Sequence, residues 1–215
     1  MVDIVLNKRR LFILGASSFG RELESWLRLI PDNYKDWEIA GYLDKDFNAL
    51  DGFPSDYKVI GEEDSFDFKP SDLVILGIAD PLIKRSIYKK LQGKVSFYTY
   101  IAPNAVIGKF NIIEEGSIIC PNVVITTNVI ISKCTTINLG AYIGHDVKLD
   151  PFVSIMPNVD LGGFVSVGEG AFLGTKTTVI PSKRIGAYAF IGAGSVVIRN
   201  VQEGDKMVGN PARKL

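Results

Sequence analysis

The chain has 215 residues, with 24 basic and 24 acidic residues and a formal net charge of zero. This balance gives no sign of a nucleic-acid surface or of a patch for anionic membranes. No apolar run approaches the ~18 residues of a membrane span, and the charges of the N-terminus follow a short apolar stretch. The two cysteines, Cys120 and Cys134, are too few for a disulfide framework and are predicted to be free thiols. We therefore expect a soluble, cytoplasmic protein without membrane insertion.

The first hundred residues alternate between strand and helix patterns. Buried-type strands are predicted at residues 10–15, 38–43, 72–77 and 95–100, and helices at residues 21–30 and from residue 81 to about residue 91. Alternation of this kind indicates a parallel sheet with crossover helices. Residues 1–100 are therefore predicted to form a small Rossmann-like domain.

The turn after the first strand, residues 15–20, resembles the G-x-G-x-x-G fingerprint, but Ser17 replaces its middle glycine. That glycine lets a pyrophosphate approach the backbone, so a dinucleotide such as NAD is disfavoured. Helix-terminal N–H groups with two hydroxyls can still hold a phosphate or sugar, and a tight turn without a ligand is the alternative. Gly15, Asp44 and Gly77 follow three strands and are expected at one sheet edge, where Asp44 is placed to bond a ribose or uracil edge.

Residues 101–215 contain a strict period of six. Stepping by six from Ile101 to Val197 meets an aliphatic residue at all seventeen positions. Four places after each, fifteen of the seventeen residues are Ala, Ser, Thr or Val, and Asn111 and Lys183 are the exceptions. The place between them, three after each aliphatic residue, is Asn, Gly or Asp ten times, and these types tolerate the positive φ of tight corners.

Neither a helix nor an ordinary strand has a period of six, whereas a parallel β-helix of hexapeptide repeats does. Each unit gives one short strand and a corner, and three units complete a coil. The aliphatic phase is predicted to fill the interior, and the flat outer faces favour packing into a threefold oligomer.

His145 is the only histidine of the chain, and Asp146 follows it. Because Ile143 is in the inward phase, His145 lies near a corner and is expected to face outward. Histidine exchanges a proton near neutral pH, so an outward imidazole beside a carboxylate is a candidate general base. A surface histidine without a role is the alternative.

This combination resembles the bacterial sugar acetyltransferases of the sialic acid O-acetyltransferase type, whose relatives N-acetylate nucleotide-linked amino sugars for surface glycans. The resemblance covers essentially the whole chain and is carried by residues 15–20, 143–147, 191–197 and 209–213. It implies a left-handed β-helix over residues 101–215, a homotrimer, and acetyl-CoA bound between neighbouring β-helices as the acetyl donor, with no metal.

The resemblance also implies roles for individual residues. His145 is the general base and Asp146 supports it. Contacts to acetyl-CoA are expected at Ser154, Gly174, Thr175, Gly192 and Ala193, and contacts to the nucleotide sugar at Ser17, Ser18, Phe19, Asp44, Lys45 and Gly77. Relatives often have histidine at the places of Ser154 and Phe19. By its spacing from His145, the backbone N–H of Gly163 is expected to polarise the thioester carbonyl.

Other readings of the β-helix fit less well. A zinc-dependent β-helix carbonic anhydrase needs several histidines, and this chain has one. N-acetylation of a nucleotide-linked amino sugar is favoured because the front domain supplies nucleotide-like contacts. O-acetylation of sialic acid or of another sugar hydroxyl is the alternative reaction. A nucleotide-binding scaffold trimer is the alternative without catalysis.

Overall fold

The computed structural model describes residues 8–215, so the first part of the N-terminal stretch considered above lies outside the described residues. The chain divides into two compact units. One runs to Ile78 and includes Ile87–Tyr98, and the other consists of Ala79–Ser86 and Thr99–Leu215. Within residues 8–215, no helix has the length and apolar character needed to cross a membrane.

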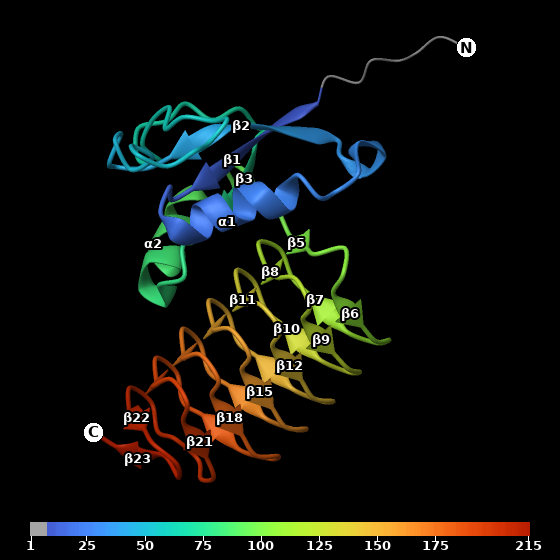
Figure 1. The fold of residues 1–215 in the computed structure, drawn as a ribbon, viewed down its shortest axis with the longest axis vertical. Helices are drawn as coiled ribbons and strands as arrows, with labels where there is room; N and C mark the ends of the chain where they lie inside the picture. The colour runs from blue at the N-terminus through green and yellow to red at the C-terminus, as the bar shows by residue number, and fades with distance from the viewer. Residues whose placement is uncertain (1–7) are drawn as a thin grey trace. The chain divides into compact units, whose positions relative to one another are not determined.

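The first unit is built on a parallel four-stranded sheet with the strand order β2-β1-β3-β4 (Figure 1). Its strands and helices are β1 (Arg9–Leu14), α1 (Ser18–Leu27), η1 (Asp32–Tyr34), β2 (Trp37–Leu43), β3 (Leu73–Leu76) and β4 (Ser96–Phe97). Helix α2 (Pro81–Leu91) is divided, with its residues up to Ser86 in the second unit and the rest in the first. Strand β3 is buried along its whole length, as expected for an inner strand of a parallel sheet covered on both faces. The predicted Rossmann-like fold is confirmed.

Helix α1 begins earlier and ends earlier than residues 21–30, where its pattern predicted it. It starts at Ser18 because Ser17 is extended and acts as the N-cap. At the other end, Leu29 N–H donates to Trp26 O and Ile30 N–H to Leu27 O, which tightens the last turn ahead of Pro31. Sequence periodicity does not register such end effects, because the apolar residues continue past the last α-helical turn.

A buried carboxylate holds α1 against the sheet. The Glu24 Oε2 atom accepts hydrogen bonds from the Tyr42 and Ser55 hydroxyls, each 2.6 Å away, and Oε1 pairs with Arg28 at 2.6 Å. A buried charge needs this degree of pairing to be tolerated. The contact fixes the start of α1, and with it the turn at residues 15–20, relative to β2.

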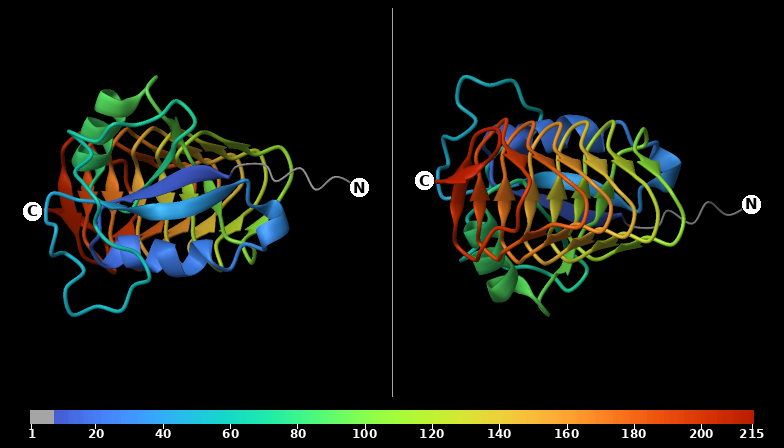
Figure 2. Two further views of the ribbon diagram at one scale, coloured as in Figure 1. Left: turned by 90° about the horizontal axis from the view of Figure 1, so that it is seen from above. Right: turned by 90° about the horizontal axis from the view of Figure 1, so that it is seen from below.

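The second unit is the predicted left-handed parallel β-helix, with three sheets (Figures 1 and 2). The six-stranded sheet contains β6 (Val106–Ile107), β9 (Val124–Ile125), β12 (Tyr142–Ile143), β15 (Asp160–Leu161), β18 (Thr178–Val179) and β21 (Val196–Val197). The five-stranded sheet contains β7 (Ile112–Ile113), β10 (Ile130–Ile131), β13 (Lys148–Leu149), β16 (Ser166–Val167) and β19 (Arg184–Ile185). The eight-stranded sheet contains β5 (Tyr100–Ile101), β8 (Ile118–Ile119), β11 (Thr136–Ile137), β14 (Ser154–Ile155), β17 (Phe172–Leu173), β20 (Phe190–Ile191), β22 (Lys206–Val208) and the antiparallel β23 (Arg213–Lys214).

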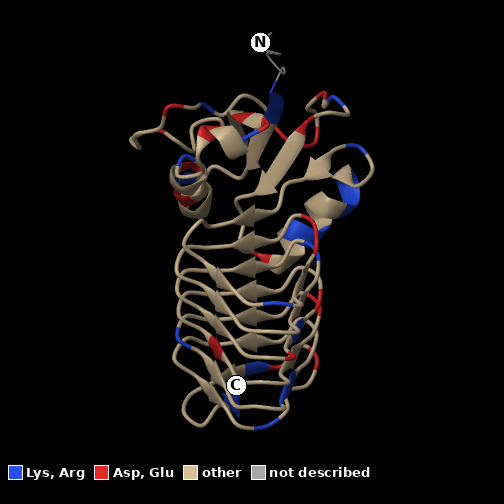
Figure 3. Cartoon of the chain, turned by 90° about the vertical axis from the view of Figure 1, so that its right-hand side faces the viewer, with Lys and Arg blue, Asp and Glu red and all other residues tan. Residues whose placement is uncertain are grey.

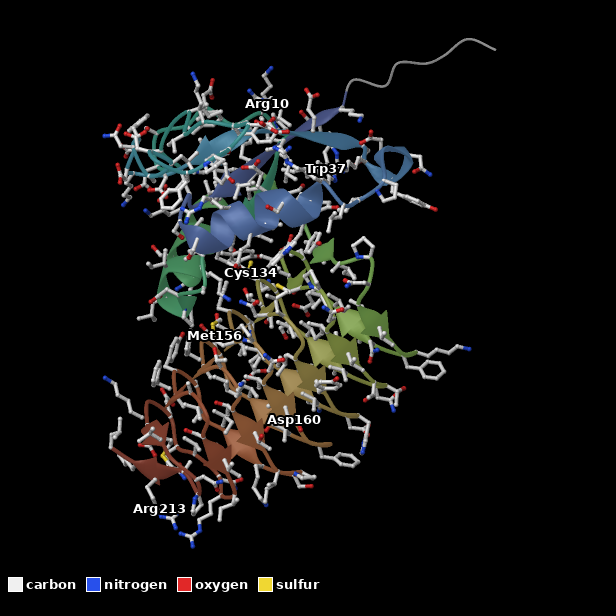
Figure 4. The ribbon with its side chains drawn as sticks, in the orientation of Figure 1. Arg10, Trp37, Cys134, Met156, Asp160 and Arg213 are labelled. Carbon is white, nitrogen blue, oxygen red and sulfur yellow. The ribbon has the colours of Figure 1, made fainter. Side chains whose placement is uncertain are left out.

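Successive coils stack in register. Tyr142 of β12 pairs with Val124 of the coil before and with Asp160, labelled in Figure 4, of the coil after. The aliphatic phase is almost fully buried from Ile119 to Val197, with at most 1% of any of these residues exposed. On the side presented in Figure 3, the charged residues of the coils are scattered and of both signs. The inward phase is therefore confirmed as the core of this unit from Ile119 onward, whereas Ile101 is 41% exposed and Ile107 and Ile113 are only partly buried.

From residue 110 to residue 194 the corners have a left-handed backbone, whatever residue stands there. The fourth place of each unit has a φ between 53° and 69° throughout residues 110–194. Asn, Asp and Gly fill many of these places, as predicted, but bulky residues such as Phe110 and Tyr188 adopt the same conformation. Such a φ is uncommon for large side chains. Register with the neighbouring coils therefore sets the corner geometry, and the local residue preference only assists it.

A buried lysine joins Ala79–Ser86 to the coils of the same unit. The Lys84 ammonium donates to Thr136 Oγ1 and to the Val153 carbonyl, both at 3.1 Å, and the residue is fully buried. Burial lowers the pKa of Lys84 to about 7. Cys134, labelled in Figure 4, is also buried, and burial raises the pKa of its thiol to about 12. Both cysteines are free thiols, as predicted.

The stability of this unit should depend on pH through Lys84. Its folded pKa of about 7 lies below the ordinary value of 10.5, so the unfolded chain binds more protons between these values. Folding stability then rises with pH across that window, by up to about 1.4 kcal/mol per pH unit. The variant Lys84→Met has no ionisable group at this position, so its folding stability should lack this increase with pH. The unfolding free energies of both proteins are measured by urea unfolding at about pH 7.5 and about pH 8.5. The value of wild type minus that of the variant should be larger at the higher pH. A difference that stays constant contradicts the assignment.

Candidate active site

In the first unit, three strand ends meet at one edge of the sheet, as predicted. Gly15 N–H donates to the carbonyl of Leu43 at 2.9 Å, and Gly77 N–H donates to that of Leu14 at 2.8 Å. Asp44 follows β2, and its Oδ2 accepts the Ala16 N–H at 2.7 Å. Because β2 and β3 lie on opposite sides of β1, this edge is the point where the strand order reverses. Open α/β sheets bind ligands at that point.

Glycine at this edge is required by close packing. A Cβ on Gly20 would lie 2.0 Å from the Gly15 carbonyl oxygen, and one on Gly77 would lie 2.8 Å from the Cα of Gly20. Gly15 itself has a φ of 95°. These three glycines let the turn at residues 15–20 sit directly against the end of β3.

The other predicted substrate-binding residues of this unit differ in how far their side chains are exposed. Ser17 and Ser18 are exposed at the start of α1, and the Ser17 side chain makes no capping hydrogen bond. Lys45 is exposed and lies 3.6 Å from Asp64. Phe19 is only 7% exposed and packs edge-on against Trp26. The structure therefore turns the two serines outward and the Phe19 ring into the core.

In the second unit, His145 and Asp146 form a hydrogen-bonded pair on the corner between β12 and β13. His145 Nδ1 lies 2.8 Å from Asp146 Oδ2, and 53% of the His145 side chain is exposed. His145 faces outward, as predicted. Because Nδ1 is bonded to the carboxylate, the other ring nitrogen, Nε2, is the one able to accept a proton.

The following coil lies directly against the imidazole. A Cβ on Gly163 would lie 2.5 Å from His145 Nε2, so only glycine leaves room for the ring in this position. The Gly163 N–H donates to no acceptor within residues 8–215. Phe164 meets the imidazole edge to face, with ring centroids 5.1 Å apart and an interplanar angle of 88°.

Sequence reasoning missed two residues at this corner, Asn128 and Phe164. They stand one coil before and one coil after Asp146, each at the fourth place of its unit and with positive φ. Asn128 Nδ2 donates to Asp146 Oδ1 at 3.4 Å. Stacking the sequence one coil at a time would have placed all three in one column.

Four of the predicted acetyl-CoA residues lie together on a different corner. Gly174 and Thr175 follow β17, and Gly192 and Ala193 follow β20, in adjacent coils. Gly174 N–H donates to the Ile191 carbonyl at 2.8 Å. Ala193 is exposed, and Thr175 and Gly192 are partly exposed. This corner joins the eight-stranded to the six-stranded sheet, whereas the corner of His145 joins the six-stranded to the five-stranded sheet.

Ser154 lies on the eight-stranded sheet and is fully buried. Its hydroxyl donates to the Ala79 carbonyl at 2.6 Å, within the second unit. A contact of this hydroxyl with a cofactor would require Ala79 to give up that bond. Within residues 8–215, no group of three or more His, Cys, Asp or Glu residues could hold a metal ion.

Comparison with known proteins supports the resemblance from both ends of the chain. Residues 10–91 match the family model of the PglD N-terminal domain. GDP-perosamine N-acetyltransferase of Escherichia coli O157:H7 is 34% identical over 118 residues, which cover 53% of this chain and 53% of that protein. Serine acetyltransferase 4 of Arabidopsis thaliana is 31% identical over 133 residues, or 57% of this chain and 31% of that protein. The chain thus spans about half or less of these curated relatives.

Two solved structures match almost the whole chain. The acetyltransferase domain of PglB from Neisseria gonorrhoeae FA1090, in complex with acetyl coenzyme A, has a TM-score of 0.84 and 26% identity, covering 97% of this chain and 100% of that one. PerB from Caulobacter crescentus, in complex with CoA and GDP-perosamine, has a TM-score of 0.81 and 28% identity, covering 95% and 96%. The predicted resemblance to the sugar acetyltransferases is confirmed: residues 10–91 match the PglD N-terminal domain model, and the chain, with its left-handed parallel β-helix, is similar to these acetyltransferases.

Proposed function

We propose that this protein transfers the acetyl group of acetyl-CoA to the amino group of a nucleotide-linked amino sugar, in the biosynthesis of a surface glycan. The observation that carries the proposal is the His145–Asp146 pair beside Gly163, on an outer corner of the β-helix. PglB and PerB, which match this chain over nearly its full length, were solved with acetyl coenzyme A and with CoA plus GDP-perosamine.

His145 is proposed as the general base. Its Nδ1–H donates to Asp146, which leaves the lone pair of Nε2 to take a proton from the sugar amine. The amine nitrogen forms the new bond to the thioester carbonyl carbon, the carbon–sulfur bond breaks, and CoA leaves as its thiolate. The imidazolium then returns the proton to that sulfur. Asp146 stabilises the imidazolium while it carries the charge.

Gly163 is proposed to assist from the next coil. Its backbone N–H has no acceptor within the described residues, and the side of Gly163 where a Cβ would stand faces the imidazole. A fixed N–H donor stabilises the negative charge that develops on a carbonyl oxygen under attack. The absence of a side chain at Gly163 leaves room for the imidazole ring.

The acetyl-CoA contacts are proposed at Gly174, Thr175, Gly192 and Ala193. They lie on another edge of the β-helix than His145, so the surface of one chain does not bring the two sets together. Two β-helices packed side by side can supply one edge each. This separation supports a homotrimer with its active sites between neighbouring chains.

The nucleotide is proposed to bind at the sheet edge of the first unit. Ser17 and Ser18 offer hydroxyls at the start of α1, where unpaired N–H groups favour a phosphate. Asp44 and Gly77 follow the flanking strands, and Lys45 adds an exposed positive charge. Phe19 contributes by packing, because its ring is buried.

The proposed compartment is the cytoplasm. Cys120 and Cys134 are buried free thiols, which fits a reducing environment.

The replacement His145→Ala tests the base assignment. Thiol release from acetyl-CoA is measured with UDP-, dTDP- and GDP-linked 4-amino sugars and with free sialic acid. We expect one amino sugar to react and the variant to lose about 10²–10⁴-fold in rate. Lys109→Ala is the matched control, because Lys109 is the exposed residue at the same place of a unit two coils earlier. It should retain wild-type activity.

Each other outcome of that assay has a definite meaning. Reaction with sialic acid alone would replace N-acetylation by O-acetylation. Acetyl transfer that survives in His145→Ala would remove the base assignment. If no acceptor in the panel gives thiol release and acetyl-CoA does not bind, the acetyltransferase proposal itself is contradicted.

The replacement Gly163→Ala tests the arrangement around the ring. The backbone of Gly163 does not need a positive φ, so alanine should be accepted by the fold. Its methyl group would displace the imidazole, and misplacement of a catalytic group by about 1 Å can cost up to about 100-fold in rate. NMR of the single histidine ring should show shifted nitrogen resonances in a folded variant. Unshifted resonances with full activity would mean that the ring does not lie over Gly163.

A further inference from the structure

Three successive coils meet at the imidazole, and each contributes one side chain from the same place of its corner. These residues are Asn128, Asp146 and Phe164. We infer that Asn128 and Phe164 are positioning residues that hold the His145–Asp146 pair from the coils before and after it. The inference rests on the proposed role of His145 as the base, and it adds two residues that act through that base.

Asn128 fixes the carboxylate. The Asp146 carboxylate has Oδ2 on His145 Nδ1 at 2.8 Å and Oδ1 on Asn128 Nδ2 at 3.4 Å, so both oxygens are engaged. Asn128 is itself held by its backbone N–H, which donates to the Lys109 carbonyl at 3.4 Å. With both oxygens bonded, the carboxylate plane cannot turn without breaking a contact, and the ring that depends on Oδ2 keeps its direction.

Phe164 bounds the ring on the side of the following coil. Its ring meets the imidazole edge to face at 5.1 Å, a favoured arrangement of two aromatic rings. Its backbone N–H also donates to the carbonyl of His145 at 2.9 Å, which ties the two residues together. Phe164 and Gly163 together limit where Nε2 can point. Neither Asn128 nor Phe164 carries a charge, and Asp146 is the ionisable group that contacts the ring.

The replacement Asn128→Asp separates positioning from folding. Asparagine and aspartate both tolerate the positive φ of this corner, so the variant should fold. It exchanges an amide that donates to Asp146 for a second carboxylate that repels it. A new negative charge near the pair favours the imidazolium, so the titration midpoint of the ring should rise by on the order of one pH unit.

The experiment follows the ring resonances of the single histidine by NMR across pH, together with the pH profile of kcat/KM. We expect both the ring midpoint and the acid limb of the profile to move to higher pH in Asn128→Asp, with kcat reduced. Asn122→Asp is the matched control. Asn122 is exposed and has a φ of 61°, against 57° for Asn128, but it stands on the corner of the acetyl-CoA contacts. Its ring midpoint should equal that of wild type.

A second pair tests the aromatic contact. Phe164→Leu should lower kcat about tenfold at an unchanged KM for acetyl-CoA, because it removes orientation of the base rather than binding. Phe164→Tyr keeps an aromatic ring at this position and should therefore have the wild-type rate. Phe110→Leu, on the same edge and also with positive φ, serves as the control and should have no effect.

The outcomes separate the two claims. A ring midpoint that is equal in Asn128→Asp and wild type, or a rate of Phe164→Leu equal to wild type, overturns the positioning inference while leaving His145 as the base. If wild type transfers no acetyl group, the proposed function fails. The NMR titration, which needs no substrate, still supports or overturns the contact of Asn128 with the pair.

Discussion

Each side of a coil in this β-helix must place one aliphatic side chain inward and turn one corner within six residues. From Ile119 to Val197 that constraint buries the first place of each unit and, in nearly all units, the fifth place, and over residues 110–194 it gives the fourth place a left-handed backbone. Only the corner and the outward strand position stay free for chemistry. His145 and Asp146 occupy such a corner, and their neighbours in space come from the same corner of the coils on either side. The site is therefore a column, assembled from residues far apart in the sequence by the register of the coils.

This constraint also explains why so much could be predicted from the sequence. The aliphatic phase and the small-residue phase are strictly periodic, and burial follows both of them closely. The outward direction of His145 follows from the inward position of Ile143. In the first unit, the ends of the three strands could be placed at one edge because parallel strands share their carboxyl ends.

The features that the sequence did not reveal depend on contacts that do not recur at a fixed spacing along the chain. The hydrogen bond from the Ser154 hydroxyl to the Ala79 carbonyl joins strand β14 to the segment just before α2, and no sequence spacing predicts this contact. Lys84 reads as an ordinary charged helix residue, yet it is fully buried within the second unit. Phe19 stands inside a glycine-rich turn, where only packing against Trp26 decides that its ring turns inward. Asn128 and Phe164 share the corner place of Asp146 in the coils before and after it. Their position follows from the coil length, but no feature of either residue's own unit marks it as part of the site.

The His145–Asp146 pair and the proposed acetyl-CoA contacts lie on different edges of one β-helix. The proposed base, His145, lies on one corner, where a glycine of the next coil leaves room for the ring. The proposed acetyl-CoA contacts lie on another, where small residues leave backbone groups accessible. A catalytic centre that needs both edges depends on a second copy of the chain, which links activity to assembly.

The central claim is that the chain forms an amide on an amino sugar, and the chemical nature of the product tests it most directly. A ¹³C NMR spectrum is recorded of the product formed from carbonyl-labelled acetyl-CoA and a GDP-linked 4-amino sugar. We expect a labelled amide carbonyl on the amino nitrogen, formed by wild type and not by His145→Ala. A labelled ester, or a label that stays on CoA while the wild-type protein is folded and assembled, would contradict it.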